Sequence, residues 1–312
     1  MRASRRGLAL VLSAVLAGAS CTSSPPTSDG TAGSRAPTPT FGPSDEPLIA
    51  FHADPGGRDD TYVMDPQGGR VTAVTEGMET IAQPLWSPDG AQLIVACCTS
   101  DMGHLYLVDG PGAEPVELAA GISGAADPAW SPDGSSIAFG STASGTLFVV
   151  DVSGPRPGDP RELGLTGAGP SWSPDGSRIA FFADRNGNLD IYTARRDGTD
   201  VVPVTDDAAP EYSPSWSPSG NLIAFVSEAD GDQDMHVVRP DGSREVDVSR
   251  DAVPDDFPVW SPGGDRLAYV AYLHGADPLT IGDGDAEIFV VGSDGARRRN
   301  LSQNPAWDGD PA

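Results

Sequence analysis

The chain contains no lysine, only four histidines and only three cysteines among its 312 residues. All 19 basic residues are therefore arginine, against 45 aspartates and glutamates, and the formal net charge is −26. Because such a surface repels phosphate, we expect no nucleic-acid partner. The sequence also lacks Walker, Gly-x-Gly-x-x-Gly, Gly-x-Ser-x-Gly and His-Glu-x-x-His motifs, so it offers none of the common phosphate-binding, serine-hydrolase or zinc-protease signatures.

Two of the cysteines, Cys97 and Cys98, are adjacent at the end of a predicted strand. Neighbouring strand residues point to opposite faces, so we expect two small apolar core residues. A strained vicinal disulfide is the alternative. Two adjacent cysteines without further ligands are a weak basis for a metal site.

No apolar run reaches the roughly 20 residues that a membrane-spanning helix needs. Residues 1–20 instead combine three early arginines, a short apolar stretch and the small residues Gly18-Ala19-Ser20 before Cys21. This order predicts a signal peptide, and its ending resembles the lipobox of bacterial lipoproteins. The resemblance implies that Cys21 is lipidated and that the protein is exported and anchored to the outer face of the cytoplasmic membrane. A secreted protein without a lipid is the alternative.

Residues 21–46 are rich in Ser, Thr and Pro and predict a disordered linker, because they contain too few apolar residues to bury a core. The remaining residues, 47–312, are expected to form one folded and monomeric domain.

A five-residue motif divides this domain. Trp-Ser-Pro-Asp-Gly begins at Trp86, Trp130 and Trp172, and variants of it begin at Trp216 and Trp260. The spacing of 42 to 44 residues suits a repeat built as a four-stranded propeller blade. Ser, Pro and Gly occupy the first, second and fourth positions of a type I turn. We expect each tryptophan to pack between neighbouring blades.

The strands of one copy are predicted at Ile179–Phe181, Ile191–Thr193 and Val201–Thr205, after a short first strand ending at Trp172. The other copies follow in register, and an earlier copy begins with Leu48–Phe51. The sequence therefore predicts an all-β fold, a six-bladed β-propeller of four-stranded antiparallel blades.

Two segments compete to complete the first blade. Phe41–Asp45 resembles a degenerate copy of the turn motif. Asp310-Pro311-Ala312 matches Asp127-Pro128-Ala129 before Trp130, and would supply the missing strand from the C-terminus. We favour the second arrangement because it leaves no open sheet edge in the ring.

Pro170–Phe181, Asp190-Ile191-Tyr192 and Thr61–Asp65 together resemble the TolB-like β-propeller repeat, also called PD40 or WD40-like. The resemblance covers nearly all of residues 47–312. It implies a periplasmic or cell-surface binding scaffold, and the same family also includes propeller domains joined to enzymes.

The predicted connections between blades mix acidic and aromatic side chains, a combination that suits a binding rim. The candidate rim residues are Glu211, Tyr212, Asp255, Asp256, Phe257 and Trp307. They predict a protein, peptide or glycan partner. For Trp307, packing against the closing strand is the alternative.

Acidic hairpins alternate oxygen-bearing side chains around glycine, as the first half of a calcium loop does. The candidate ligands are Asp184, Asn186, Asn188, Asp190, Asp230, Asp232 and Asp234. Ordinary turns are the alternative, because the glutamate that completes a calcium loop is missing. Calcium is thus the one cofactor that the sequence suggests.

The four histidines, His52, His104, His236 and His274, belong to different predicted blades and could converge on a metal only in the central channel. Our principal hypothesis is a membrane-anchored, non-catalytic binding scaffold. The alternatives are a metal-dependent lyase or hydrolase with a channel-mouth site, and a calcium-stabilised structural or sensor protein.

Overall fold

The structure is a computed structural model that describes residues 48–53, 60–65, 71–75, 77–78, 84–97, 103–229, 231–250, 252–273 and 285–302. Across these segments, no helix has the length and apolar character to cross a bilayer. The predictions for the signal peptide, Cys21, the linker, Cys98, Asp230, His274, Trp307 and both ring-closure segments lie outside the described residues.

The strands form six sheets, numbered here as blades one to six. Blade one contains β1 (Ile49–Ala53), β2 (Asp60–Met64) and β3 (Thr72–Ala73). Blade two contains β4 (Leu85–Trp86), β5 (Leu93–Cys97), β6 (His104–Val108) and β7 (Val116–Glu117). Blade three contains β8 (Ala125–Trp130), β9 (Ser136–Ser141), β10 (Thr146–Asp151) and β11 (Arg161–Thr166).

Blade four contains β12 (Ala168–Trp172), β13 (Arg178–Asp184), β14 (Leu189–Arg195) and β15 (Val202–Pro203). Blade five contains β16 (Glu211–Trp216), β17 (Ile223–Ser227), β18 (Asp234–Val238) and β19 (Val246–Asp247). Blade six contains β20 (Asp255–Trp260), β21 (Arg266–Leu273), β22 (Asp285–Gly292) and β23 (Arg299–Asn300).

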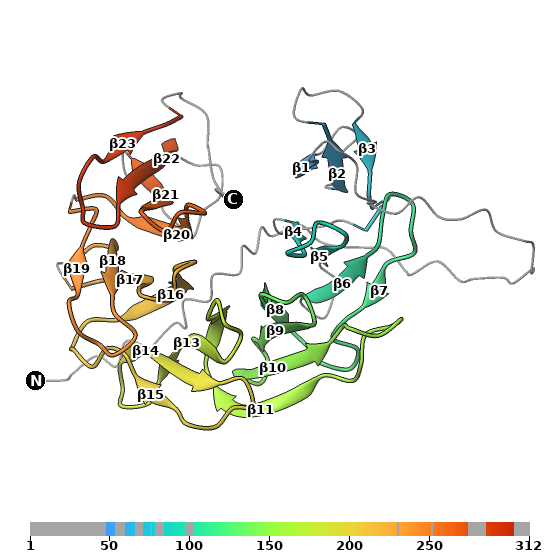
Figure 1. The fold of residues 1–312 in the computed structure, drawn as a ribbon, viewed down its shortest axis with the longest axis horizontal. Helices are drawn as coiled ribbons and strands as arrows, with labels where there is room; N and C mark the ends of the chain where they lie inside the picture. Colours follow the sequence, from blue (N-terminus) through green and yellow to red (C-terminus); the bar gives the residue numbers. More distant parts are fainter. Residues whose placement is uncertain are drawn as a thin grey trace, which may run out of the picture.

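Each blade is an antiparallel meander in which sequential strands pair with one another. The blades stand around a common centre, with β8, β16 and β20 nearest to it and β11, β19 and β23 at the periphery (Figure 1). Blades one and six are the two ends of the ring (Figure 1). The predicted six-bladed propeller is confirmed, and blade one has three strands among the residues described.

The Trp-Ser-Pro-Asp-Gly motif forms the predicted turn. In each full copy the glycine N–H donates to the serine carbonyl three residues earlier, as Gly134 does to Ser131 at 2.9 Å. The Ser131 hydroxyl donates to the Asp133 carboxylate at 2.6 Å, and the Ser135 N–H donates to the same oxygen at 3.0 Å. The aspartate therefore closes the turn that joins the first two strands of the blade.

The repeat tryptophans join neighbouring blades, as predicted. The indole N–H of Trp172 donates to the Ala129 carbonyl of blade three at 3.1 Å, and that of Trp260 donates to the Ser215 carbonyl of blade five at 3.0 Å. Each acceptor immediately precedes the tryptophan of the previous blade. A residue repeated every 42 to 44 positions thus forms the same inter-blade contact for Trp130, Trp172 and Trp260, whereas the indole N–H of Trp216 has no hydrogen-bond partner.

The hydrophobic core is divided among the interfaces between blades. One cluster joins blades two and three through Ile94 and Phe139, and another joins blades three and four through Leu147 and Phe181. A third cluster extends across blades four, five and six. A single four-stranded sheet cannot cover both of its faces, so the ring is the unit that removes this apolar surface from water.

Candidate functional site

The innermost strands β8, β12, β16 and β20 begin on one face of the ring, here called the pocket face. Each is interrupted by a bulge, because its register against the second strand of the blade shifts. In each of these four strands, the residue three positions before the repeat tryptophan has a left-handed backbone: Asp127 (φ 51°), Gly169 (φ 58°), Ser213 (φ 53°) and Phe257 (φ 58°). Only Gly169 adopts this conformation without a steric cost.

A bulge re-aims the side chains at one end of a strand, and bulges are frequent beside binding sites. Four such bulges lie at equivalent positions, so the side chains at the start of these strands point in directions that regular strands would not allow. Sequence reasoning missed this feature, because Ser213 and Phe257 are not residues that favour a positive φ and the strand pattern gives no sign of a bulge.

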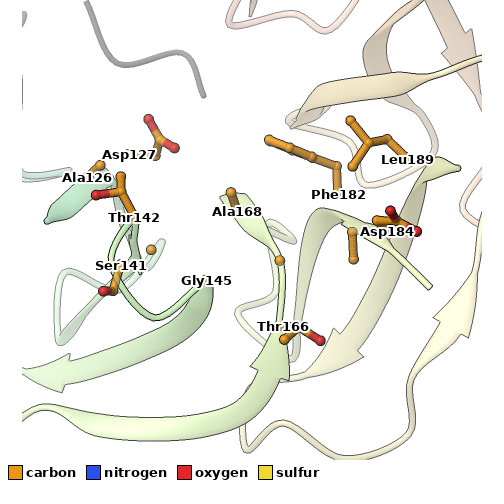
Figure 2. A pocket seen from close by; sticks show the side chains of 13 residues that line it. Ala126, Asp127, Ser141, Thr142, Gly145, Thr166, Ala168, Phe182, Asp184 and Leu189 are labelled. Carbon is orange, nitrogen blue, oxygen red and sulfur yellow. The ribbon is translucent and has the colours of Figure 1, made fainter. Parts of the chain in front are cut away.

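A cavity of about 230 Å³ opens on the pocket face between blades three and four. Figure 2 shows its lining, with Ala126, Asp127 and Thr142 on one side and Phe182, Asp184 and Leu189 on the other. The remaining lining residues are Gly140, Ser141, Gly145, Thr166, Gly167, Ala168 and Ala183. An apolar cavity of about 150 Å³ can hold benzene, so this one has room for a single aromatic or branched side chain.

Small residues create the cavity. Ala168 lies four positions before its repeat tryptophan, where blades five and six have Tyr212 and Asp256. Gly140 lies ten positions after its tryptophan, where blade four has Phe182 and blade five has Val226. The space that these side chains fill at the four–five and five–six interfaces is therefore left open between blades three and four.

Two glycines bring the Phe182 segment against β12. A Cβ on Gly167 would lie 2.6 Å from the Phe182 carbonyl oxygen, and one on Gly169 would lie 2.8 Å from the Phe182 ring. A larger residue at position 169 would push the Phe182 ring away, and one at position 167 would push away the Phe182 backbone. The aromatic wall of the cavity thus depends on both glycines.

The electrostatic environment of the cavity is acidic. Burial raises the pKa of Asp127 to about 6, a hydrogen bond from the Gly169 backbone opposes the rise, and the charge of Asp256 adds to it. The Asp184 carboxylate is exposed at the end of β13 and accepts the Gly187 N–H at 2.8 Å. An apolar cavity with carboxylates at its rim suits an apolar side chain flanked by positive charge.

The raised pKa of Asp127 predicts how stability depends on pH. The folded chain binds this proton more tightly than the unfolded chain, whose ordinary value is 3.8. The stability gained is complete below pH 3.8 and is lost as the pH rises through about 6. Asp127→Asn, which keeps a side chain that tolerates positive φ, should therefore raise the melting temperature at pH 7.5 by a few degrees, or about 1–2 kcal/mol, and have little effect near pH 3.5.

Asp133→Asn is the control, because the contribution of Asp133 to stability should depend on pH in the opposite direction. Hydrogen bonds from Ser131 and Ser135 hold the pKa of Asp133 at about 2, so its contribution is present above pH 3.8 and is lost on acidification. Melting curves of both variants from pH 2 to 7.5 test the assignment. A gain for Asp127→Asn that is the same at every pH would contradict it.

Comparison with known proteins identifies the family. Residues 38–158 and 161–282 match the family model of the TolB beta propeller domain. The chain belongs to the TolB β-propeller family. The family resemblance predicted from the repeat is thus confirmed.

Solved structures agree with this assignment. The putative TolB from Agrobacterium tumefaciens superposes with a TM-score of 0.62 at 26% identity, over 77% of this chain and 87% of that one. TolB from Acinetobacter baumannii superposes with a TM-score of 0.63 at 20% identity, over 84% of this chain and 65% of that one. An oligogalacturonate lyase from Vibrio parahaemolyticus superposes with a TM-score of 0.61 at 15% identity, over 81% of this chain and 74% of that one. The last two likenesses show a shared fold alone. No curated protein matches the chain significantly.

The TolB-family propeller buries most of the candidate rim residues. Tyr212 is 2% exposed and Asp256 is 8% exposed, while Glu211 and Asp255 are fully buried. The prediction that they form an exposed rim in the connections between blades is therefore wrong. These residues lie within β16 and β20, whose first residues are packed between blades. Phe257 is partly buried at the bulge of β20.

The candidate calcium-loop residues of this propeller form turn and strand hydrogen bonds. The Asn188 amide donates to the Asp190 carboxylate at 3.2 Å and to the Ala209 carbonyl at 2.8 Å. Asp234 is buried and accepts the Ser249 hydroxyl at 3.0 Å. Asn186 is exposed and Asp232 is partly buried. Calcium binding by these hairpins stays a prediction.

Two histidines can be placed by their side chains, and each is engaged within its own blade of the TolB-family ring. His104 Nδ1 lies 2.8 Å from Glu117 Oε1 in blade two, and His236 Nδ1 lies 2.7 Å from Glu245 Oε1 in blade five. For His52, only the backbone on β1 is described. Cys97 is buried on β5, in keeping with its prediction as a core residue.

Proposed function

We propose that this TolB-family chain is a non-catalytic binding scaffold that holds an apolar side chain of a protein or peptide partner in the cavity between blades three and four. The observation that carries the proposal is the cavity itself, with walls formed by Ala126, Ala168, Phe182 and Leu189. Apolar walls suit a peptide side chain better than a glycan, which would need convergent polar groups.

The acidic rim sets the expected chemistry of the partner. Asp127 and Asp184 border the cavity, and the whole chain has a net charge of −26. A segment with one large apolar residue next to arginine or lysine would match both features, and charge complementarity would speed its association.

We also propose that the chain is exported and anchored through a lipid on Cys21. This proposal is supported by the charge and apolar pattern of residues 1–20 and by membership of a family that includes the TolB proteins named above. An anchored domain would present the pocket face to partners in the cell envelope. The mass of the mature N-terminal peptide, with or without an acyl group, tests the anchor.

Filling the cavity tests the binding function. Peptides selected from a random library on the immobilised chain would be synthesised and titrated against the wild type and against Ala168→Leu. We expect an apolar anchor residue with a basic neighbour in the selected peptides, and a dissociation constant at least tenfold higher for Ala168→Leu, because the added carbons occupy the anchor's space.

The matched control is Ala296→Leu, the same substitution at an exposed turn of blade six. It should leave the dissociation constant unchanged. Equal binding by both variants, or selection of polar peptides alone, would refute the cavity as the site. Turnover of oligouronates or peptides by the purified chain would refute the non-catalytic part of the proposal.

A further inference from the structure

A second cluster of acidic side chains lies away from the cavity lining, at the junction of blades four and five. Asp207 belongs to the connection between β15 and β16, Glu211 begins β16, and Glu245 belongs to the connection between β18 and β19. One carboxylate oxygen from each residue lies within 4.8 Å of the other two. Among the His, Cys, Asp and Glu side chains that the structure describes, these three form the one group with such spacing.

Glu211 is the unusual member of the cluster. Its side chain is fully buried, and neither carboxylate oxygen has a hydrogen-bond partner. Burial raises the pKa of Glu211 to about 8, and the nearby Thr205 hydroxyl opposes this rise without meeting the geometry of a hydrogen bond. A buried carboxyl group in this state is costly unless something else contacts its oxygens.

The surroundings hold the other two carboxylates in place. The Asp207 carboxylate accepts the Ala209 N–H at 2.7 Å, and the Asn188 amide fixes the same connection through the Asp207 carbonyl at 3.1 Å. Glu245 accepts a hydrogen bond from His236, which leaves lone pairs on the carboxylate for a cation. No arginine forms an ion pair with any of the three acids within the described part of the chain.

We propose that Asp207, Glu211 and Glu245 bind one calcium ion at the junction of blades four and five. Calcium takes oxygen ligands at about 2.3–2.6 Å, so oxygens that all lie within 4.8 Å of one another can share one ion. The set is made of oxygen ligands alone, which suits calcium, whereas magnesium needs near-ideal octahedral geometry and keeps several waters, and zinc prefers nitrogen and sulfur ligands. The ion would bridge β16 and the connection that leads into it from blade four.

This site differs from the hairpin residues that the sequence suggests for calcium. Neither Asp207 nor Glu245 belongs to those hairpins, and Glu211 was assigned there to a binding rim. The two locations predict different effects of substitution, so one experiment distinguishes them.

Calorimetric titration of CaCl₂ into the chelator-treated full chain tests the proposal, with concentrations up to about 10 mM because the weaker natural calcium sites bind at about 10⁻⁴–10⁻³ M. We expect one ion per chain and a rise in the melting temperature with calcium. Glu211→Gln and Asp207→Asn should raise the dissociation constant at least tenfold and abolish the rise. Asp206→Asn, an exposed neighbour, and Asp232→Asn, in the hairpin, should bind as the wild type does.

Asp207 is exposed, so Asp207→Asn provides the test even where Glu211→Gln does not fold. No heat and no shift of the melting temperature for the wild type up to about 10 mM would overturn the proposal. Unchanged affinity in Asp207→Asn, or loss of binding in Asp232→Asn, would also overturn it. Loss of binding in Asp232→Asn would instead place the calcium ion in the hairpin.

Discussion

Replacing Trp172 with alanine is expected to lower the free energy of unfolding by about 3–5 kcal/mol. Trp172 is 7% exposed and packs at the interface between blades three and four. Its indole donates to the Ala129 carbonyl, and the Arg196 guanidinium lies 5.6 Å from its ring centroid. The substitution would leave a cavity and an unpaired carbonyl at once, and denaturant unfolding would measure the loss.

A phenylalanine series separates the packing from the hydrogen bond. Trp172→Phe should cost about 1–2 kcal/mol because the Ala129 carbonyl loses its donor. Trp216→Phe should cost less, since the buried indole N–H of Trp216 has no hydrogen-bond partner. Equal losses in the two variants would show that the inter-blade hydrogen bond contributes nothing measurable.

Gly198→Ala is expected to destabilise the fold by about 2–5 kcal/mol, from strain of the left-handed backbone together with overpacking. Gly198 has φ 88° in the turn between β14 and β15, and a Cβ there would lie 2.2 Å from the Leu163 carbonyl oxygen of blade three. The clash involves backbone, so relief would require one blade to move away from the other.

Gly187→Ala is the matched control. Its φ of 87° is nearly the same, and a Cβ there would meet nothing within 4 Å. It should cost only the backbone strain, about 1–2 kcal/mol. Melting temperatures of the two variants measure the difference directly, at about 2–4 °C per kcal/mol for a chain of this size. Equal losses would mean that contact with Leu163 does not matter.

The fold could be predicted in detail because its signals are local. The turn motif, the strand that starts seven residues after each tryptophan and the 42-to-44-residue spacing each describe one blade, and every copy repeats them. Hydrogen bonding within a hairpin and the alternation of apolar residues depend on near neighbours. The number of blades, the strand order and the inter-blade role of the tryptophans therefore followed from the sequence.

The candidate site could be predicted only in part. The sequence predicts Glu211 and Tyr212 as rim residues in a connection between blades, whereas they are buried as the first two residues of β16. Their exposure depends on how closely blade four approaches blade five, which no local pattern records. Neither Asp207 nor Glu245 carried a signal in the sequence, because each is an ordinary acidic residue in a turn.

The sequence by itself determined the repeat, the turns and the strands, since each arises from residues close together in the chain. Only the tertiary structure decided where Ala126 and Ala168 leave a cavity, which glycines meet a neighbouring blade, and which carboxylates converge around Glu211. These features arise between blades, from residues some 40 positions apart whose distance is set by the packing of the whole ring.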